Sequence, residues 1–126
     1  MTNKQDKAFD ILLHLIISML WCKKFECSYS SITDDDWAEV LSLAIKQTVA
    51  GIAFNALDKV PKDMQPSKQV LLKWSVLATR VTMQNKKMND TLCDLFSVLQ
   101  SKNFQPILQK GQGIAQKYPL PELREC

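Results

Sequence analysis

Hydrophobic residues recur at spacings of three and four along the first hundred residues, which is typical of amphipathic helices. We expect four helices, at about residues 4–23, from Thr33 to the polar pair Gln47–Thr48, at 49–57 and at 67–102. Pro61 and Pro66 mark the connection before the fourth. The pattern then changes at Phe104, where a shorter segment with two glycines begins.

The first helix is apolar around most of its circumference and carries one narrow polar stripe. Lys7, Asp10, His14 and Ser18 form this stripe at spacings of three and four. A helix of this kind is buried on most sides. We expect His14 to be exposed or paired with Asp10. The apolar run 11–21 is too short to cross a bilayer, and we interpret it as a core helix.

Three consecutive aspartates open the second helix after Thr33. Thr33 is a good N-cap residue, and carboxylates in a first turn complement the helix dipole. Successive helical residues point about 100° apart, so Asp34, Asp35 and Asp36 do not converge on one metal ion. The pattern therefore predicts capping. In the third helix, Gly51 is expected to let another helix pack closely.

The fourth helix is the longest, and no Gly or Pro interrupts it. Its apolar seam runs from Val70 to Leu99, and the polar stretch 84–87 breaks it, so a kink or partial exposure is expected there. Lys73, Arg80 and Lys87 repeat every seven residues and share one face. A solvated basic face is the plainer interpretation, and contact with nucleotide phosphates or an acidic substrate is the alternative.

Residues 104–126 predict a strand, a glycine turn and a short helix. Pro106 suits the start of an edge strand, and the pattern predicts a helix from Ile114 to Tyr118 that ends before Pro119. The turn itself consists of Lys110, Gly111, Gln112 and Gly113. Such a turn can present backbone N–H groups and a positive dipole to phosphate. A turn that needs glycine only for steric reasons is the alternative.

These C-terminal residues resemble the family of uncharacterised bacterial nucleotidyltransferases, which belong to the polymerase-beta-like superfamily. The resemblance rests on an apolar segment, Lys110-Gly111, Ile114-Ala115, Lys117-Tyr118-Pro119 and Arg124. In that family, Gly-Asp-x-Asp follows. The resemblance implies that Lys110, Gly111, Gln112, Gly113 and Arg124 bind the nucleotide. Gln112 stands where the wider superfamily often has Ser or Gly.

The resemblance also implies an architecture and a chemistry. We expect a mainly α fold, with a helical scaffold at 1–103 leading into the first strand and helix of an α+β nucleotidyltransferase core at 104–126. The chain would be the N-terminal part of a longer enzyme that moves a nucleotidyl group from a nucleoside triphosphate to an unidentified acceptor. Magnesium would bind only in the complete protein. The present residues would include no catalytic or metal-binding group and would be inactive alone.

Composition adds few restrictions. Hydrophobic residues make up 46% and charged residues 23%, and the net charge is +3, which is too mild to indicate nucleic-acid binding. The four cysteines lack a C-x-x-C spacing, so we expect reduced thiols in a cytoplasmic protein, although a Cys22–Cys27 bridge remains an alternative.

A rival interpretation is a helical protein-interaction module without catalysis. An isolated strand leaves both hydrogen-bonding edges unsatisfied, so in that case either a homodimer or a different fold of residues 104–126 is expected.

Overall fold

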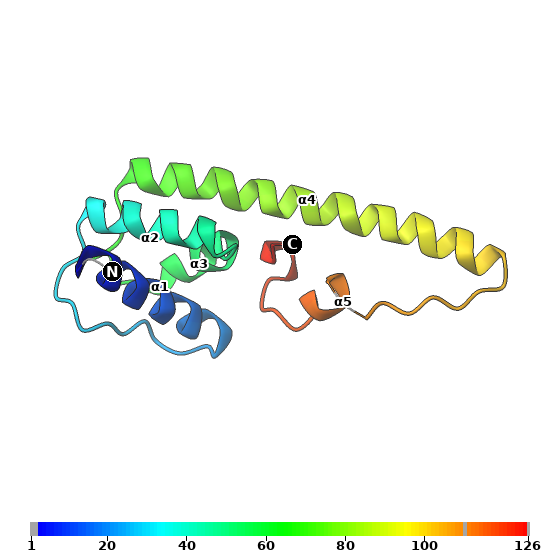
Figure 1. Cartoon of the computed structure of the whole chain (residues 1–126), viewed down its shortest axis with the longest axis horizontal. Coiled ribbons are helices and arrows are strands. Elements are labelled where there is room, and N and C mark those ends of the chain that lie inside the picture. Colours follow the sequence, from blue (N-terminus) through cyan, green and yellow to red (C-terminus); the bar gives the residue numbers. More distant parts are fainter. Residues whose placement is uncertain (1–2, 110, 126) are drawn as a thin grey trace.

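The computed structural model describes residues 3–109 and 111–125, and these residues form helices and no strand, which confirms a mainly α fold (Figure 1). Three short helices gather at one end, and a long helix runs across them and beyond. The elements in chain order are α1 (Asn3–Leu20), α2 (Asp34–Lys46), α3 (Ala50–Ala56), η1 (Leu57–Lys59), α4 (Lys68–Ser101), α5 (Gln112–Ala115) and η2 (Pro121–Leu123).

The helix ends follow the expected chemistry. Thr33 caps α2 and forms a capping box with Asp36, which confirms the capping prediction. Ser67 caps α4 through a hydrogen bond from the backbone N–H of Val70. Cys22, Thr48 and Asn103 take positive φ values just after the ends of α1, α2 and α4, and so turn the chain out of each helix.

Two tryptophans anchor the core where α2, α3 and α4 meet. Trp37 and Trp74 are both fully buried, and their rings lie edge to face with centroids 6.2 Å apart. Each indole N–H has a partner: Trp37 Nε1 donates to the carbonyl of Met64 at 2.9 Å, and Trp74 Nε1 donates to that of Ala50 at 2.8 Å. This satisfies the polar group that a buried tryptophan brings with it.

The polar stripe of α1 faces the protein more than expected. Ser18 is fully buried, and Lys7 Nζ lies 2.8 Å from an Asp36 carboxylate oxygen. His14 Nδ1 lies 3.5 Å from a carboxylate oxygen of Asp10, as predicted. The expectation that apolar residues of this helix are buried on most sides is wrong for Phe9, Leu13 and Leu20, which are exposed. The Ser18 hydroxyl donates to the carbonyl of Leu15 within α1, and Lys7 pairs with α2, so these polar groups are satisfied on the inward side.

Other sequence predictions are settled by the same structure. Cys22 and Cys27 are free thiols, so the alternative bridge does not form. Among the described helices, none combines the length and apolar character that a membrane span requires. The helix α4 runs without interruption through residues 84–87.

The strand expected at 104–109 does not form in the described residues. Pro106, Ile107 and Leu108 have no regular secondary structure, and Ile107 is 79% exposed. A strand needs a neighbouring strand as its hydrogen-bonding partner, and no described segment of the chain pairs with these residues. The following helix is also shifted, because α5 spans Gln112–Ala115 rather than 114–118. Hydrogen-bonded turns follow α5, and one of them is closed by the bond from the Tyr118 N–H to the Ala115 carbonyl.

Candidate functional site

The glycine turn opens α5, and its two glycines serve different purposes. Gly111 has φ +58°, which L side chains rarely adopt, and a Cβ there would meet nothing within 4 Å. The space beside Gly111 is therefore open. A Cβ at Gly113 would lie 2.8 Å from the carbonyl oxygen of Leu108, so this glycine lets the turn pack on itself. Lys110 lies outside the described residues.

Gln112 points into the protein. It is 5% exposed, and its Nε2 donates to Asn89 Oδ1 at 2.7 Å and to the carbonyl of Asn85 at 3.4 Å. Its side-chain donors are thus directed at α4, and this anchors the turn to the helix. The predicted contact between Gln112 and a phosphate would have to come from its backbone.

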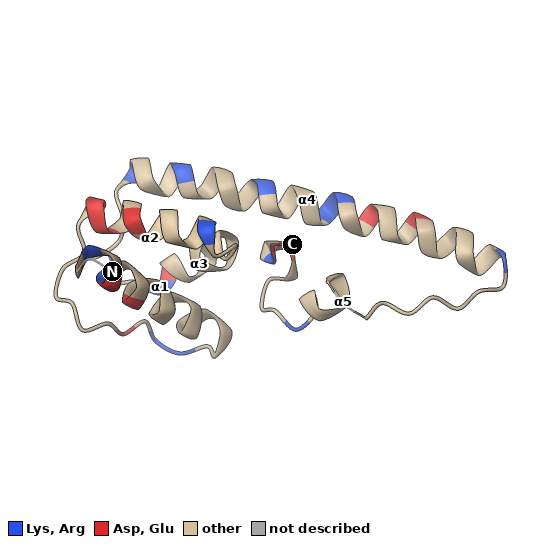
Figure 2. Ribbon diagram, viewed as in Figure 1, with Lys and Arg blue, Asp and Glu red and all other residues tan. Residues whose placement is uncertain are grey.

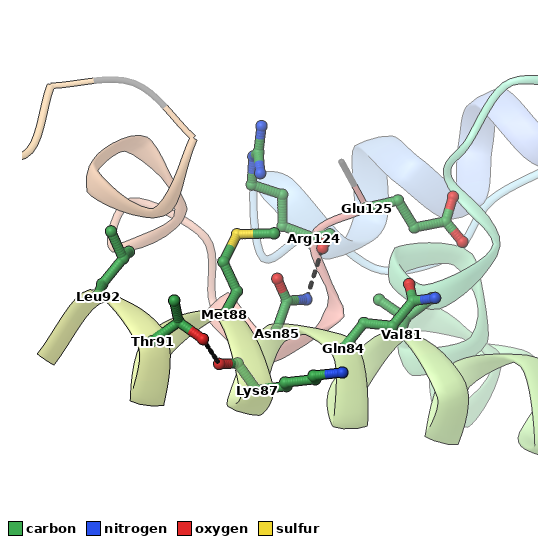
Figure 3. A pocket seen from close by; sticks show the side chains of 9 residues that line it. All are labelled: Val81, Gln84, Asn85, Lys87, Met88, Thr91, Leu92, Arg124 and Glu125. Carbon is green, nitrogen blue, oxygen red and sulfur yellow. Dashed lines mark hydrogen bonds between the residues drawn. The ribbon is translucent and has the colours of Figure 1, made fainter. Parts of the chain in front are cut away.

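Arg124 is held through its backbone by the same turn of α4. Asn85 Nδ2 donates to the carbonyl oxygens of Glu122 and Arg124, both at 2.6 Å. Figure 3 shows the Arg124 side chain extending away from this bond, past the side chain of Met88. The structure therefore brings two of the predicted residues, Gln112 and Arg124, to one point on α4.

The last described residues also bind to α3. A Cβ on Gly51 would lie 2.6 Å from the carbonyl oxygen of Leu123, so Gly51 permits a close approach. The approaching element is η2 rather than the helix expected from the sequence. Burial raises the pKa of Glu125 above its ordinary value of 4.5, although its carboxylate accepts hydrogen bonds from the backbone N–H groups of Ala50 and Gly51, which act in the opposite direction. Glu125 thereby caps α3, whose N-cap residue Val49 makes no side-chain cap bond.

Asn85 is the residue that the sequence interpretation missed. It was assigned to a polar break, yet it is 2% exposed and connects Gln112 with Arg124. A signal was present, because residues 78, 81, 85, 88 and 92 continue the alternating spacing of three and four. A polar residue at a seam position predicts a buried amide with specific partners. For Glu125, no sequence signal indicated the cap.

A groove of about 410 Å³ lies between α4 and the C-terminal residues (Figure 3). Its lining is mostly apolar, and it consists of Val81, Gln84, Asn85, Lys87, Met88, Thr91, Leu92, Arg124 and Glu125. Within the described part of the chain, two buried acceptors near this point have no hydrogen-bond partner, namely Asn85 Oδ1 and Gln112 Oε1. The groove therefore combines apolar walls with charged side chains.

Basic residues are spaced along α4, whereas its acidic residues lie only in the second half (Figure 2). Lys73, Arg80 and Lys87 are all exposed. Lys87 also lines the groove, and Lys73 and Arg80 do not. The seven-residue repeat thus places one of the three basic side chains beside the candidate site.

The side chains that the structure describes do not fit a magnesium ion. Among residues 3–109 and 111–125, no three His, Cys, Asp or Glu side chains are grouped so that they could hold a metal. Of the acids nearest the turn, Glu122 is exposed and Glu125 is engaged with α3. No metal-dependent step can be assigned to these side chains.

The fold and the site define a helical module that holds an open glycine turn and an arginine against one long helix. The chain belongs to the family of uncharacterised nucleotidyltransferases, whose family model matches residues 33–126. The match covers α2 to η2 and includes the glycine turn, Asn85 and Arg124. No curated protein and no solved structure matches the chain.

Proposed function

We propose that this chain forms the nucleotide-facing part of a bacterial, cytoplasmic nucleotidyltransferase that transfers a nucleotidyl group from a nucleoside triphosphate to an acceptor. The family match over residues 33–126 carries the proposal. The open space beside Gly111 supports it, since phosphate can approach the backbone there without meeting a side chain.

In this proposal the residues have separate roles. Lys110 supplies a point charge to the triphosphate, and the backbone from Gly111 to Gly113 lies beside it. Arg124 supplies a second charge, and Asn85 positions it through its carbonyl oxygen. The magnesium-binding carboxylates would come from sequence beyond these residues, as the Gly-Asp-x-Asp of the family pattern implies. The chain alone would bind nucleotide weakly and would not turn it over.

The test uses the protein encoded by the whole reading frame, with calorimetric titration of each nucleoside triphosphate in magnesium. Charged hydrogen bonds contribute about 1.5–3 kcal/mol, so Lys110→Ala and Arg124→Ala should each weaken binding by roughly 10- to 100-fold. Lys102→Ala is the matched control, since Lys102 is an exposed cation at the distant end of α4. Unchanged affinity in both site variants would refute the assigned phosphate contacts.

A helical interaction module is the second candidate, and one observation favours it. Apolar side chains on the second half of α4 and the segment after it are exposed, including Leu95, Val98, Phe104 and Ile107. In this case two copies would associate through these side chains. Sedimentation velocity checks this, because the module predicts a dimer that Leu95→Lys dissociates, and a monomer at every concentration would exclude it.

A further inference from the structure

A second groove lies beside the first part of α4, between this helix and α2. It has a volume of about 330 Å³, and Val70 and Lys73 line it from α4. We call it the α2 groove, and we call the groove beside Arg124 the C-terminal groove. Lys73 of the α2 groove and Lys87 of the C-terminal groove are two seven-residue repeats apart. Two such repeats return to within about 40° of the same direction on a helix, so both grooves open along one side of α4.

Both grooves have apolar floors. Leu41 and Val70 line the α2 groove, and Val81 and Leu92 line the C-terminal groove. Leu41 and Val81 are buried, so the floors are recessed below the surface of the protein. The part of α4 from Val70 to Leu92 is about 33 Å long at 1.5 Å per residue. A partner that fills both grooves must therefore be long and must present projecting apolar side chains.

Basic side chains border this side of α4 at regular intervals. Lys73 and Lys87 each line a groove, and Arg80 lies between them in the same seven-residue repeat. The stretch 67–88 includes no Asp or Glu, and basic residues are spaced along it (Figure 2). Within the described residues, none of these three cations lies in an ion pair with a carboxylate. Glu125 also lines the C-terminal groove, but its carboxylate is engaged with α3. The charge of this side therefore complements an acidic partner.

The shape and the spacing favour a helix over a lipid surface as that partner. A flat surface does not reach recessed floors such as Leu41 and Val81, whereas a ridge of side chains on a helix packs into a groove. A helix that lies along α4 repeats the positions beside its apolar face every seven residues. This is also the period of Lys73, Arg80 and Lys87, so acidic residues at those positions of the partner would face the three cations.

We propose that this side of α4 is a docking surface for an amphipathic helix of a partner protein, with acidic residues beside its apolar face. The apolar side chains of the partner enter the α2 groove and the C-terminal groove. Its carboxylates lie against Lys73, Arg80 and Lys87. The inference goes beyond nucleotide binding and does not depend on it.

The test is a fluorescence-anisotropy titration of the chain with three labelled peptides, each three heptads long. The first has Leu at positions a and d and Glu at e and g, and its like charges oppose pairing with itself. The second has Lys in place of Glu, and the third is the first in scrambled order. The glutamate peptide should bind at least about tenfold more tightly than the other two. No binding of the glutamate peptide, or equal binding of the scrambled one, would overturn the proposal.

Charge reversal tests the location. The double variant Lys73→Glu with Lys87→Glu should weaken binding of the glutamate peptide by at least about tenfold and should strengthen binding of the lysine peptide. The control is Lys24→Glu with Lys102→Glu, which changes the net charge equally at exposed positions that line neither groove. Equal effects of the two double variants would show that only the overall charge matters, and the docking surface would be refuted.

A pair of apolar variants tests the grooves themselves. Ile45 is exposed and lines the α2 groove, so Ile45→Ser should weaken binding of the glutamate peptide by about fivefold. Leu72 is more exposed, at 67%, and lines neither groove, so Leu72→Ser should leave the affinity unchanged. The reverse result would place the peptide on the outer face of α4 and would overturn the proposal. Phosphatidylglycerol vesicles are the last probe: if the chain sediments with them through Lys73 and Lys87 and does not bind the glutamate peptide, the surface binds lipid and the proposal fails.

Discussion

The two halves of α4 carry the same apolar seam but differ in what covers it. In the first half, Trp74, Ala78, Val81 and Asn85 are buried against α2, α3 and η2. The second half, from residue 86 to 101, has no buried residue, and it extends past the other helices (Figure 1). The spacing of apolar residues thus shows which side of a helix can be buried, and it does not show whether another segment covers that side.

We call residues 68–85 of α4 the covered half and residues 86–101 the uncovered half. Asn85 and the groove lie where these two halves meet, so the change in burial along α4 also marks the candidate site. Here the C-terminal residues return to α4 after the long excursion of 102–109 (Figure 1). The long helix supplies one wall, and the C-terminal segment, which the Asn85 amide holds against it, supplies the other. Such a boundary is a common place for binding sites, since the framework stays fixed while the ligand remains accessible.

The largest expected effect comes from removing a core anchor of the covered half. Trp74→Ala should lower the free energy of unfolding by about 3–5 kcal/mol, because it leaves a cavity and also leaves the carbonyl of Ala50 without its donor. Leu95→Ala, at a seam position of the uncovered half, should change it by less than about 0.5 kcal/mol. Urea denaturation followed by circular dichroism measures both. Comparable losses would show that the second half of α4 is covered in solution.

A glycine pair gives the next comparison. Gly51→Ala places a Cβ 2.6 Å from the Leu123 carbonyl, and α3 cannot move easily, so we expect a loss of about 1–3 kcal/mol. Gly113→Ala makes a similar clash at 2.8 Å with the Leu108 carbonyl, but residues 104–109 are loosely held and can shift. Thermal unfolding should therefore show a smaller effect for Gly113→Ala, and the reverse order would contradict the assigned difference in rigidity.

Much of the helical scaffold could be predicted from the sequence, because its signals are local. Thr33, Ser67 and Asn103 mark helix ends through their own side chains and backbone. The prediction of a strand at 104–109 was wrong, because a strand forms only beside a neighbouring strand and the local sequence pattern does not show whether one exists. The positive φ of Gly111 agrees with the predicted turn.

The connections within the candidate site were beyond sequence reasoning. Asn85 reaches Arg124 across 39 positions, and a pairing over such a distance leaves no periodic trace. The Glu125 carboxylate caps a helix that begins 75 positions earlier, at Ala50. Sequence pattern identified the glycine turn as a candidate, and the structure shows what anchors it.

The smallest expected effect is a pH dependence confined to the covered region. Burial acts to raise the pKa of Asp36, but hydrogen bonds from Lys7 and Thr33 outweigh it and hold the pKa below its ordinary value of 3.8. The unfolded chain therefore binds the proton more readily, so the stabilisation is present above pH 3.8 and is lost as the pH falls through the folded pKa. Asp36→Asn should reduce stability near neutral pH by about 1 kcal/mol, the usual contribution of a capping interaction.

The pH test compares Asp36→Asn with Asp35→Asn, since Asp35 is exposed in the same helical turn. The deficit of Asp36→Asn should shrink as the pH is lowered below 3.8, while Asp35→Asn should follow the unmodified chain throughout. Denaturation curves at several pH values measure this. Hydrogen exchange at residues 90–101 should be the same in Asp36→Asn and the unmodified chain at each pH, because the Lys7–Asp36 pair joins α1 to α2 and no part of the uncovered half. A deficit that persists undiminished at the lowest pH would mean that the carboxylate charge contributes nothing, and the neutral hydrogen bonds would then account for the whole effect.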